Sequence, residues 1–215
     1  MKLPLVLFAA ATLLLQSGCV LGRRTLTLDV PTSSAPAVTK AKVYVAAVTD
    51  NRAFQNNPSD PSVPSIDGDV TKISPAQKDL MIGRQRGGFG NAAGDIGLPD
   101  NDSVTKRVRL LVEEGLKRSG YEVVTTPDTP NTLTVSVDQF WAWMTPGFWA
   151  LTFEAKITTK VTVKTATSTS SFTVLGYGLN HGQVAKDGNW QEAYAPAFED
   201  FLTNFKREVE KLDLH

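Results

Sequence analysis

Two segments of the chain carry apolar side chains at the spacing of an amphipathic helix, in which positions three and four apart share one face. The first segment is 102–119, and its apolar face comprises Val104, Val108, Leu111, Val112, Gly115 and Leu116. The second is 196–212, and its face comprises Phe198, Phe201, Leu202, Phe205, Val209 and Leu212. The pattern therefore predicts two main helices, each with one buried side.

The residues at the ends of these segments predict where the helices begin and stop. Asp100 or Asp102 can cap the first helix, and Gly120 stands where a helix often ends. The second helix begins either at Pro196 or earlier, near Gln191, in which case Pro196 lies inside it and kinks it.

Between and before the helices, the pattern changes to a period of two, which is typical of strands with one buried face. The expected strands are 25–30, 41–48, 121–125, 133–143, 151–165 and 171–179. A strand, a helix, a run of consecutive strands and a closing helix predict an α+β fold. We expect an antiparallel sheet, arranged as a meander, with both main helices packed on one face.

One long excursion, 53–101, has neither period. Its first part, 53–75, is rich in proline and asparagine and is expected to be a flexible flap, whereas 76–101 is expected to be an ordered loop. The small, polar stretch 31–40 reads as a linker. The predicted organisation is thus a signal peptide at 1–18, an N-terminal part with one short strand and the linker at 19–40, and a single domain at 41–215.

The N-terminus predicts export and lipid attachment. An uncharged apolar run follows Lys2, too short to cross a membrane but typical of a secretory signal. Leu15–Cys19 (LQSGC) then resembles a bacterial lipobox, although Gln16 departs from its usual apolar or small residue. Cys19 is the only cysteine, so it is the predicted site of covalent lipid and the chain has no internal disulfide. By the same resemblance, Val20 favours the outer membrane.

Charge argues against nucleic acid as a partner. Removal of 1–18 takes away Lys2 and no acidic residue, which leaves 21 basic against 22 acidic side chains. A nearly neutral chain has no general attraction for a polyanion. Membrane attachment would therefore come from the acyl chains on Cys19.

The glycine-rich stretch 84–99 (RQRGGFGNAAGDIGLP) raises the question of nucleotide binding. Its glycines do not have the G-x-G-x-x-G spacing, no helix pattern opens after them, and no P-loop spacing is present. We expect no nucleotide and no cofactor. If the ordered part of the excursion forms a partner or ligand surface, Arg84, Arg86 and Phe89 are its candidate residues, with the two arginines as anion-recognising groups.

Metal and catalytic sites are not predicted either. The two histidines, His181 and His215, have no zinc-like spacing, and the acidic residues near Asp67 fall short of a calcium loop. His181 is the one plausible internal base and lies in a segment that resembles a turn. We therefore expect no enzymatic activity, and a hydrolase would require His181 to lie beside a serine or carboxylate in a cleft.

Three features in order make the chain similar to the YajG-like lipoprotein family of bacteria. They are the lipobox, an early strand that ends in Thr49-Asp50-Asn51-Arg52, and the helix-to-strand passage Val112–Val123 (VEEGLKRSGYEV). The resemblance implies a membrane-anchored α+β domain over most of 19–212. It implies no catalytic residues.

The aromatic stretch 140–149 (FWAWMTPGFW) is the remaining candidate surface. Either its rings fill the core, or those left at a hairpin tip contact a partner or a membrane interface. Alternation places Trp141 and Trp143 on the face opposite Phe140, so we take Trp141, Trp143, Phe148 and Trp149 as candidate surface residues.

The expected function is that of a non-enzymatic lipoprotein on the periplasmic face of the outer membrane that binds or supports another envelope component, with an envelope protein as its partner. The alternative is a carrier of a small apolar or lipid ligand in an aromatic-lined pocket.

Overall fold

The computed structural model describes residues 23–33, 39–86, 92–212 and 214. The described part holds eight strands and three helices. They are β1 (Arg24–Thr25), β2 (Lys42–Asp50), α1 (Pro75–Leu80), β3 (Met81–Arg86), β4 (Ala92–Gly97), α2 (Val104–Arg118), β5 (Glu122–Val124), β6 (Thr132–Pro146), β7 (Leu151–Lys164), β8 (Thr169–Gly182) and α3 (Asp187–Val209). The predicted α+β class is confirmed.

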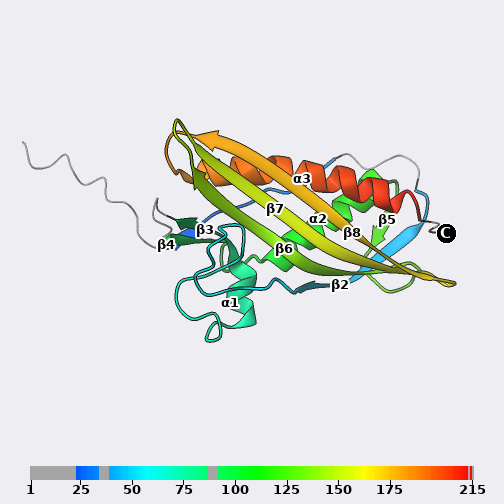
Figure 1. Cartoon of the computed structure of the whole chain (residues 1–215). Coiled ribbons are helices and arrows are strands. Elements are labelled where there is room, and N and C mark those ends of the chain that lie inside the picture. The colour runs from blue at the N-terminus through cyan, green and yellow to red at the C-terminus, as the bar shows by residue number, and fades with distance from the viewer. Residues whose placement is uncertain (1–22, 34–38, 87–91, 213, 215) are drawn as a thin grey trace, which may run out of the picture.

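The sheet branches at the long strand β6. On one side, all of β6 pairs with β7, which pairs with β8, and both pairings are antiparallel. On the other side, the first half of β6 pairs with β2 and its second half pairs with β3, both in parallel. β5 extends the sheet beyond β2, and β4 and β1 extend it beyond β3 (Figure 1).

The predicted meander is present as β6, β7 and β8. The prediction that the whole sheet is antiparallel is wrong, because the sheet also contains parallel pairs. Parallel neighbours require a connection that crosses back over the sheet. Here those connections are the segment before β3 and helix α2. Alternation within a strand predicts its buried face, but it does not predict which strands such connections bring side by side.

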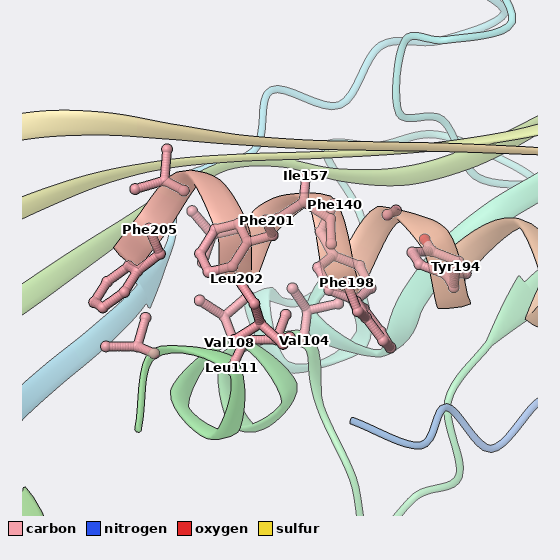
Figure 2. Close-up of a cluster of buried hydrophobic side chains, with 14 of the residues drawn as sticks. Val104, Val108, Leu111, Phe140, Ile157, Tyr194, Phe198, Phe201, Leu202 and Phe205 are labelled. Carbon is pink, nitrogen blue, oxygen red and sulfur yellow. The ribbon is translucent and has the colours of Figure 1, made fainter. Parts of the chain in front are cut away.

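Both main helices pack against the same side of the sheet and against each other (Figure 1). Figure 2 shows Phe198 and Leu202 of α3 beside Val108 of α2, in a core where Phe140 and Ile157 come from the strands. α2 is capped by Ser103, whose hydroxyl accepts from the Lys106 backbone N–H, and not by Asp100 or Asp102. α3 begins well before Gln191 and includes Pro196.

A buried carboxylate joins the two helices. Glu114 of α2 is only 4% exposed and accepts hydrogen bonds from the Arg118 side chain (2.8 Å) and the Ser33 backbone N–H (2.7 Å). Arg118 also pairs with Glu199 of α3 at 2.6 Å. Burial alone would raise the pKa of Glu114, but these hydrogen bonds outweigh it and the pKa is lowered.

α3 lies close to the edge strand β8 because two strand positions lack side chains. A Cβ on Gly176 or Gly178 would stand 2.4 or 2.2 Å from a backbone oxygen of α3. Side chains of α3 also reach the outer edge of β8: Asp200 accepts from the Tyr177 N–H (2.9 Å), and Asn204 donates to the Leu175 C=O (2.9 Å). The helix thus covers both a face and part of an edge.

The opposite face of the sheet is covered in part by the segment between β2 and α1. Phe54, Ile66, Val70 and Ile73 pack with Met81, Trp141 and Trp143 in a second, smaller core. The Trp141 indole N–H donates to the Pro61 C=O at 3.2 Å. The stretch 53–74 therefore lies against the sheet, and whether it is flexible stays a prediction. The expected loop at 76–101 is wrong, because it contains α1, β3 and β4.

Candidate functional surfaces

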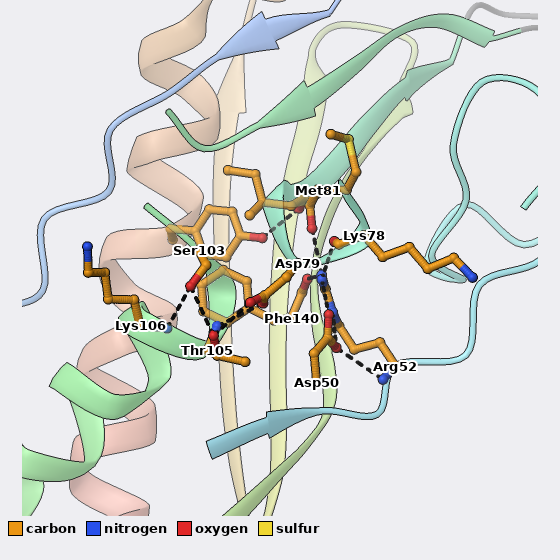
Figure 3. Close-up of polar contacts among 11 residues, drawn as sticks. Asp50, Arg52, Lys78, Asp79, Met81, Ser103, Thr105, Lys106 and Phe140 are labelled. Atoms are coloured by element: carbon orange, nitrogen blue, oxygen red, sulfur yellow. Dashed lines mark hydrogen bonds and ion pairs between the residues drawn. The ribbon is translucent and has the colours of Figure 1, made fainter. Parts of the chain in front are cut away.

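The motif Thr49-Asp50-Asn51-Arg52 ends β2 and places a buried guanidinium inside the protein. The Arg52 side chain has no exposed surface. Its Nε and Nη2 donate to the two Asp50 carboxylate oxygens at 2.8 and 2.7 Å. Nη1 donates to the C=O of Met81 (2.6 Å) and Phe140 (2.8 Å), and Nη2 to that of Lys78 (2.7 Å). All five N–H groups of the guanidinium therefore have acceptors, as Figure 3 shows.

The position of Arg52 explains this arrangement. β2 ends opposite Val137 of β6, and β3 begins its pairing at Ala142. Between them, the backbone of β6 has no strand partner on that side, and Phe140 lies in this gap. The guanidinium supplies the donor that a strand would otherwise provide. Arg52 is thus a structural clamp at the branch of the sheet.

The start of α2 is likewise occupied by the chain itself. Asp79 of α1 accepts from the Thr105 backbone N–H (3.0 Å) and hydroxyl (2.7 Å), beside the Ser103 cap (Figure 3). A helix N-terminus attracts an anion. Here a carboxylate from α1 meets that requirement and joins α1 to α2.

Two adjoining clefts open around these groups. One, of about 370 Å³, is lined mainly by 100–103, Thr105, Lys106 and Arg109. The other, of about 610 Å³, is lined by 48–52, Phe54, 75–76, 78–79 and Thr105. None of the tryptophans lines either cleft. Phe54 is the aromatic side chain that lines the second cleft, so these two clefts are not the tryptophan-lined pocket expected of a carrier.

Arg84 and Arg86 hold the covering segment against the sheet. Arg84 is 4% exposed; its Nη2 bonds Asp67 at 3.2 Å, and its Nε lies 3.3 Å from Asp95 without the geometry of a hydrogen bond. Arg86 donates to the Pro58 C=O and to the Ser65 hydroxyl. Burial raises the pKa of Asp95. Both arginines thus bind groups of this chain, and Arg84 is not accessible to an outside anion. Phe89 lies outside the described residues.

The aromatic stretch divides between core and surface. Trp141 and Trp143 are 0% and 8% exposed, so the prediction that they form a partner surface is wrong. The segment 53–74 covers them. This contact could not be predicted, because 53–74 has no hydrophobic periodicity. Phe148 and Trp149 are 89% and 83% exposed at the β6–β7 turn. Their rings meet edge to face, with centroids 4.7 Å apart.

A second apolar surface was missed. Leu175, Tyr177 and Leu179 are between 43% and 49% exposed in a row on β8, on the side away from α3. The Tyr177 hydroxyl donates to Glu154 at 2.6 Å, and burial together with this carboxylate raises the pKa of Tyr177 to about 12. The signal was present in the sequence, because Leu175, Tyr177 and Leu179 alternate with Gly176 and Gly178, and close approach of a helix to the glycine side leaves the apolar side chains on the other face.

His181 lies in β8 rather than in a turn. It is exposed, and its Nδ1 is 3.3 Å from the Thr152 hydroxyl. Neither cleft includes it. Among the described residues, no group of three or more histidine, cysteine, aspartate or glutamate side chains is arranged to hold a metal. The geometry around His181 gives no support to a hydrolase.

Part of the chain matches a protein-family model. Residues 97–184 match the family model described as "uncharacterized lipoprotein". The YajG-like resemblance is confirmed over this segment. The match runs from the end of β4 through α2 and the meander to the turn before α3, and so includes Phe148, Trp149 and the β8 row. A lipoprotein family implies membrane anchoring by lipid. Cys19, the predicted lipid site, lies outside the described residues.

Some solved structures are also similar to this chain, at low sequence identity. A crystal structure of an uncharacterized protein is 12% identical, with a TM-score of 0.41, and covers 87% of this chain and 97% of that one. Protein XCC0632 from Xanthomonas campestris is 10% identical, with a TM-score of 0.39, and covers 87% and 92%. No curated protein matches the chain. Within the described part of the chain, no helix has the length and apolar character needed to cross a membrane.

Proposed function

We propose that this chain is a non-enzymatic lipoprotein, anchored through Cys19 to the periplasmic face of the bacterial outer membrane, that binds or supports another envelope component. The lipobox and the family match support the anchor. The signal peptide at 1–18 would be removed before the lipidated cysteine becomes the N-terminus.

The observation that carries the binding role is the exposed row Leu175, Tyr177 and Leu179. These side chains lie beside Thr158, Lys156 and Glu154 of β7, with which they pair. An apolar row with a polar border is typical of a protein interface. We therefore take an envelope protein as the partner of this face.

The anchor contributes to binding by confinement. A domain held at one leaflet meets a partner in the same membrane at an effective concentration far above its average concentration. Modest affinity at the β8 row is then sufficient for a stable contact.

Site-specific photo-crosslinking in cells tests the interface. A photoreactive residue at Tyr177 should give a defined crosslinked product, and one at Thr173, exposed on the same strand beyond the apolar row, should not. Equal crosslinking at both positions would contradict the proposed face. Cys19→Ala should move the protein from the membrane pellet to the soluble fraction, and unchanged pelleting would contradict the anchor.

A further inference from the structure

The turn between β6 and β7 is built to present two aromatic rings. The Gly147 N–H donates to the Ala150 C=O at 2.9 Å and closes the turn. A Cβ on Gly147 would stand 2.6 Å from that same oxygen, so a side chain does not fit there. Phe148 and Trp149 occupy the two positions between them. They are the most exposed large apolar side chains among the described residues.

The surroundings of this tip are uncharged. The stretch 139–153, which includes both sides of the turn, contains no acidic or basic residue. The end of β8 lies next to the turn, because Gly182 pairs with Leu151. Two residues further on, Val184 is also exposed. The end of the domain at the β6–β7 turn therefore exposes apolar side chains, and the stretch of the hairpin around the turn carries no charge.

Strand directions place the start of β1 at the same end. β1 runs parallel to β4 and β4 antiparallel to β3, which is parallel to β6. Arg24, at the start of β1, therefore lies at the end of the sheet towards which β6 runs to its turn. Figure 1 accordingly shows β3, β4 and the β6–β7 turn on one side of the molecule.

The lengths agree as well. Through β4 and β3, Arg24 is level with Ala142 of β6. Gly147 is five residues beyond Ala142, and Cys19 is five residues before Arg24. Five residues span at most about 18 Å when extended. The five residues from Arg24 back to Cys19 can therefore span the same distance as the five residues from Ala142 to Gly147. A lipid on Cys19 and the rings of Phe148 and Trp149 can then contact the same membrane surface.

We propose that Phe148 and Trp149 insert into the interfacial region of the lipid bilayer and form a second, non-covalent attachment beside the lipid on Cys19. Tryptophan and phenylalanine at an uncharged tip suit the boundary between headgroups and acyl chains, where an apolar ring is buried and the indole N–H stays near water. Two attachment points fix the orientation of the domain and direct the β8 row sideways, along the membrane. The proposal rests on the proposed function in that the anchor brings the tip to the bilayer.

Tryptophan fluorescence provides the test, because Trp149 is the one exposed tryptophan of the four. The mature, lipidated protein is reconstituted into phosphatidylethanolamine–phosphatidylglycerol vesicles whose acyl chains carry bromine, a short-range quencher. Wild-type emission should fall relative to that in unbrominated vesicles, and Trp149→Phe should lose this response while keeping an aromatic ring. Absence of quenching in the wild type would overturn the proposal.

A matched control moves the exposed tryptophan away from the tip. In the double variant Trp149→Phe/Tyr177→Trp, the new indole lies on the β8 row, five residues from Gly182, and should not be quenched. Quenching there equal to that of Trp149 would overturn the proposed orientation. Shielding of Trp149 that rises with protein concentration in detergent without vesicles would identify a second copy as the occupant and also overturn the proposal.

Flotation of the same vesicles reports the anchor separately. Wild type and Phe148→Ser/Trp149→Ser should both float with the vesicles, since the lipid suffices to hold them. If Cys19→Ala/Phe148→Ser/Trp149→Ser, which lacks both attachments, floats as well as the wild type, the anchor in the proposed function is wrong, and quenching of Trp149 still decides the tip.

Discussion

Replacement of Arg52 by methionine removes the guanidinium while keeping most of the side-chain volume. Loss of one partner of a buried ion pair costs about 3–5 kcal/mol, largely because the other charge stays buried without compensation. The C=O groups of Met81 and Phe140 lose a donor as well, and each buried polar group left unsatisfied costs about 1–3 kcal/mol, whereas the Lys78 C=O still accepts from the Met81 backbone N–H. Asp50 retains 12% side-chain exposure, so water can recover part of its cost. We expect Arg52→Met to lower the free energy of unfolding by about 5 kcal/mol.

Urea unfolding followed by circular dichroism measures this loss. A loss of this size is at least a third of the roughly 5–15 kcal/mol that stabilises a typical domain. The matched control is Arg207→Met, on the exposed surface of α3, which should change stability by less than about 0.5 kcal/mol. In the double variant Asp50→Asn/Arg52→Met, part of the loss should be recovered, because the uncompensated charge is gone. A loss below about 1 kcal/mol for Arg52→Met would refute the clamp at the sheet branch.

Three further predictions concern the packing of the domain. Gly178→Ala should cost about 1–3 kcal/mol, because its Cβ would lie 2.2 Å from a backbone oxygen of α3, whereas Gly188→Ala, with open space around it, should be neutral or slightly stabilising in thermal melts. Trp141→Ala should lower stability by about 3–5 kcal/mol, and Trp149→Ala by less than about 0.5 kcal/mol; similar values in urea titrations would contradict their placement in core and surface. Glu114→Gln should destabilise at neutral pH. Because the folded-state pKa of Glu114 lies below its ordinary 4.5, the contribution of the carboxylate is present above that pH and is lost as the pH falls through the folded value. Unfolding curves at pH 7 and pH 3 should therefore show a smaller difference between wild type and variant at the lower pH.

Local patterns in the sequence were sufficient for the elements that are long and one-sided. The apolar stripes of 102–119 and 196–212 correspond to α2 and α3, and alternation identified the meander β6–β7–β8. In such elements, the period of the buried face follows directly from helix or strand geometry. Of the three features that carried the family resemblance, Val112–Val123 lies within the segment that the family model matches.

Contacts between distant segments were not predictable in this way. β3 and β4 are short and each is interrupted by glycine, so neither shows the alternation of a strand. β2 and β3 lie on the same side of β6 because of two crossover connections. The one residue in the sequence that is tied to this arrangement is Arg52, which fills the gap between the two strands. Trp141 and Trp143 were assigned to the surface because Phe140 was expected to face the core, and the two tryptophans lie on the opposite face of the strand. The covering segment 53–74, which buries them, has no period to predict it.

The hydrogen bonds from α3 to the edge of β8 bear on how many copies of the protein can share a membrane. An unpaired strand edge is a template on which the same edge of another molecule can add. Lipid anchoring would confine copies to two dimensions with their β8 strands at one height, and random collisions would then bring edges together far more often than in solution. Asp200 and Asn204 engage the N–H of Tyr177 and the C=O of Leu175, two of the groups that such an addition needs. The closing helix is therefore also a safeguard against lateral aggregation, which allows the anchored domain to be crowded.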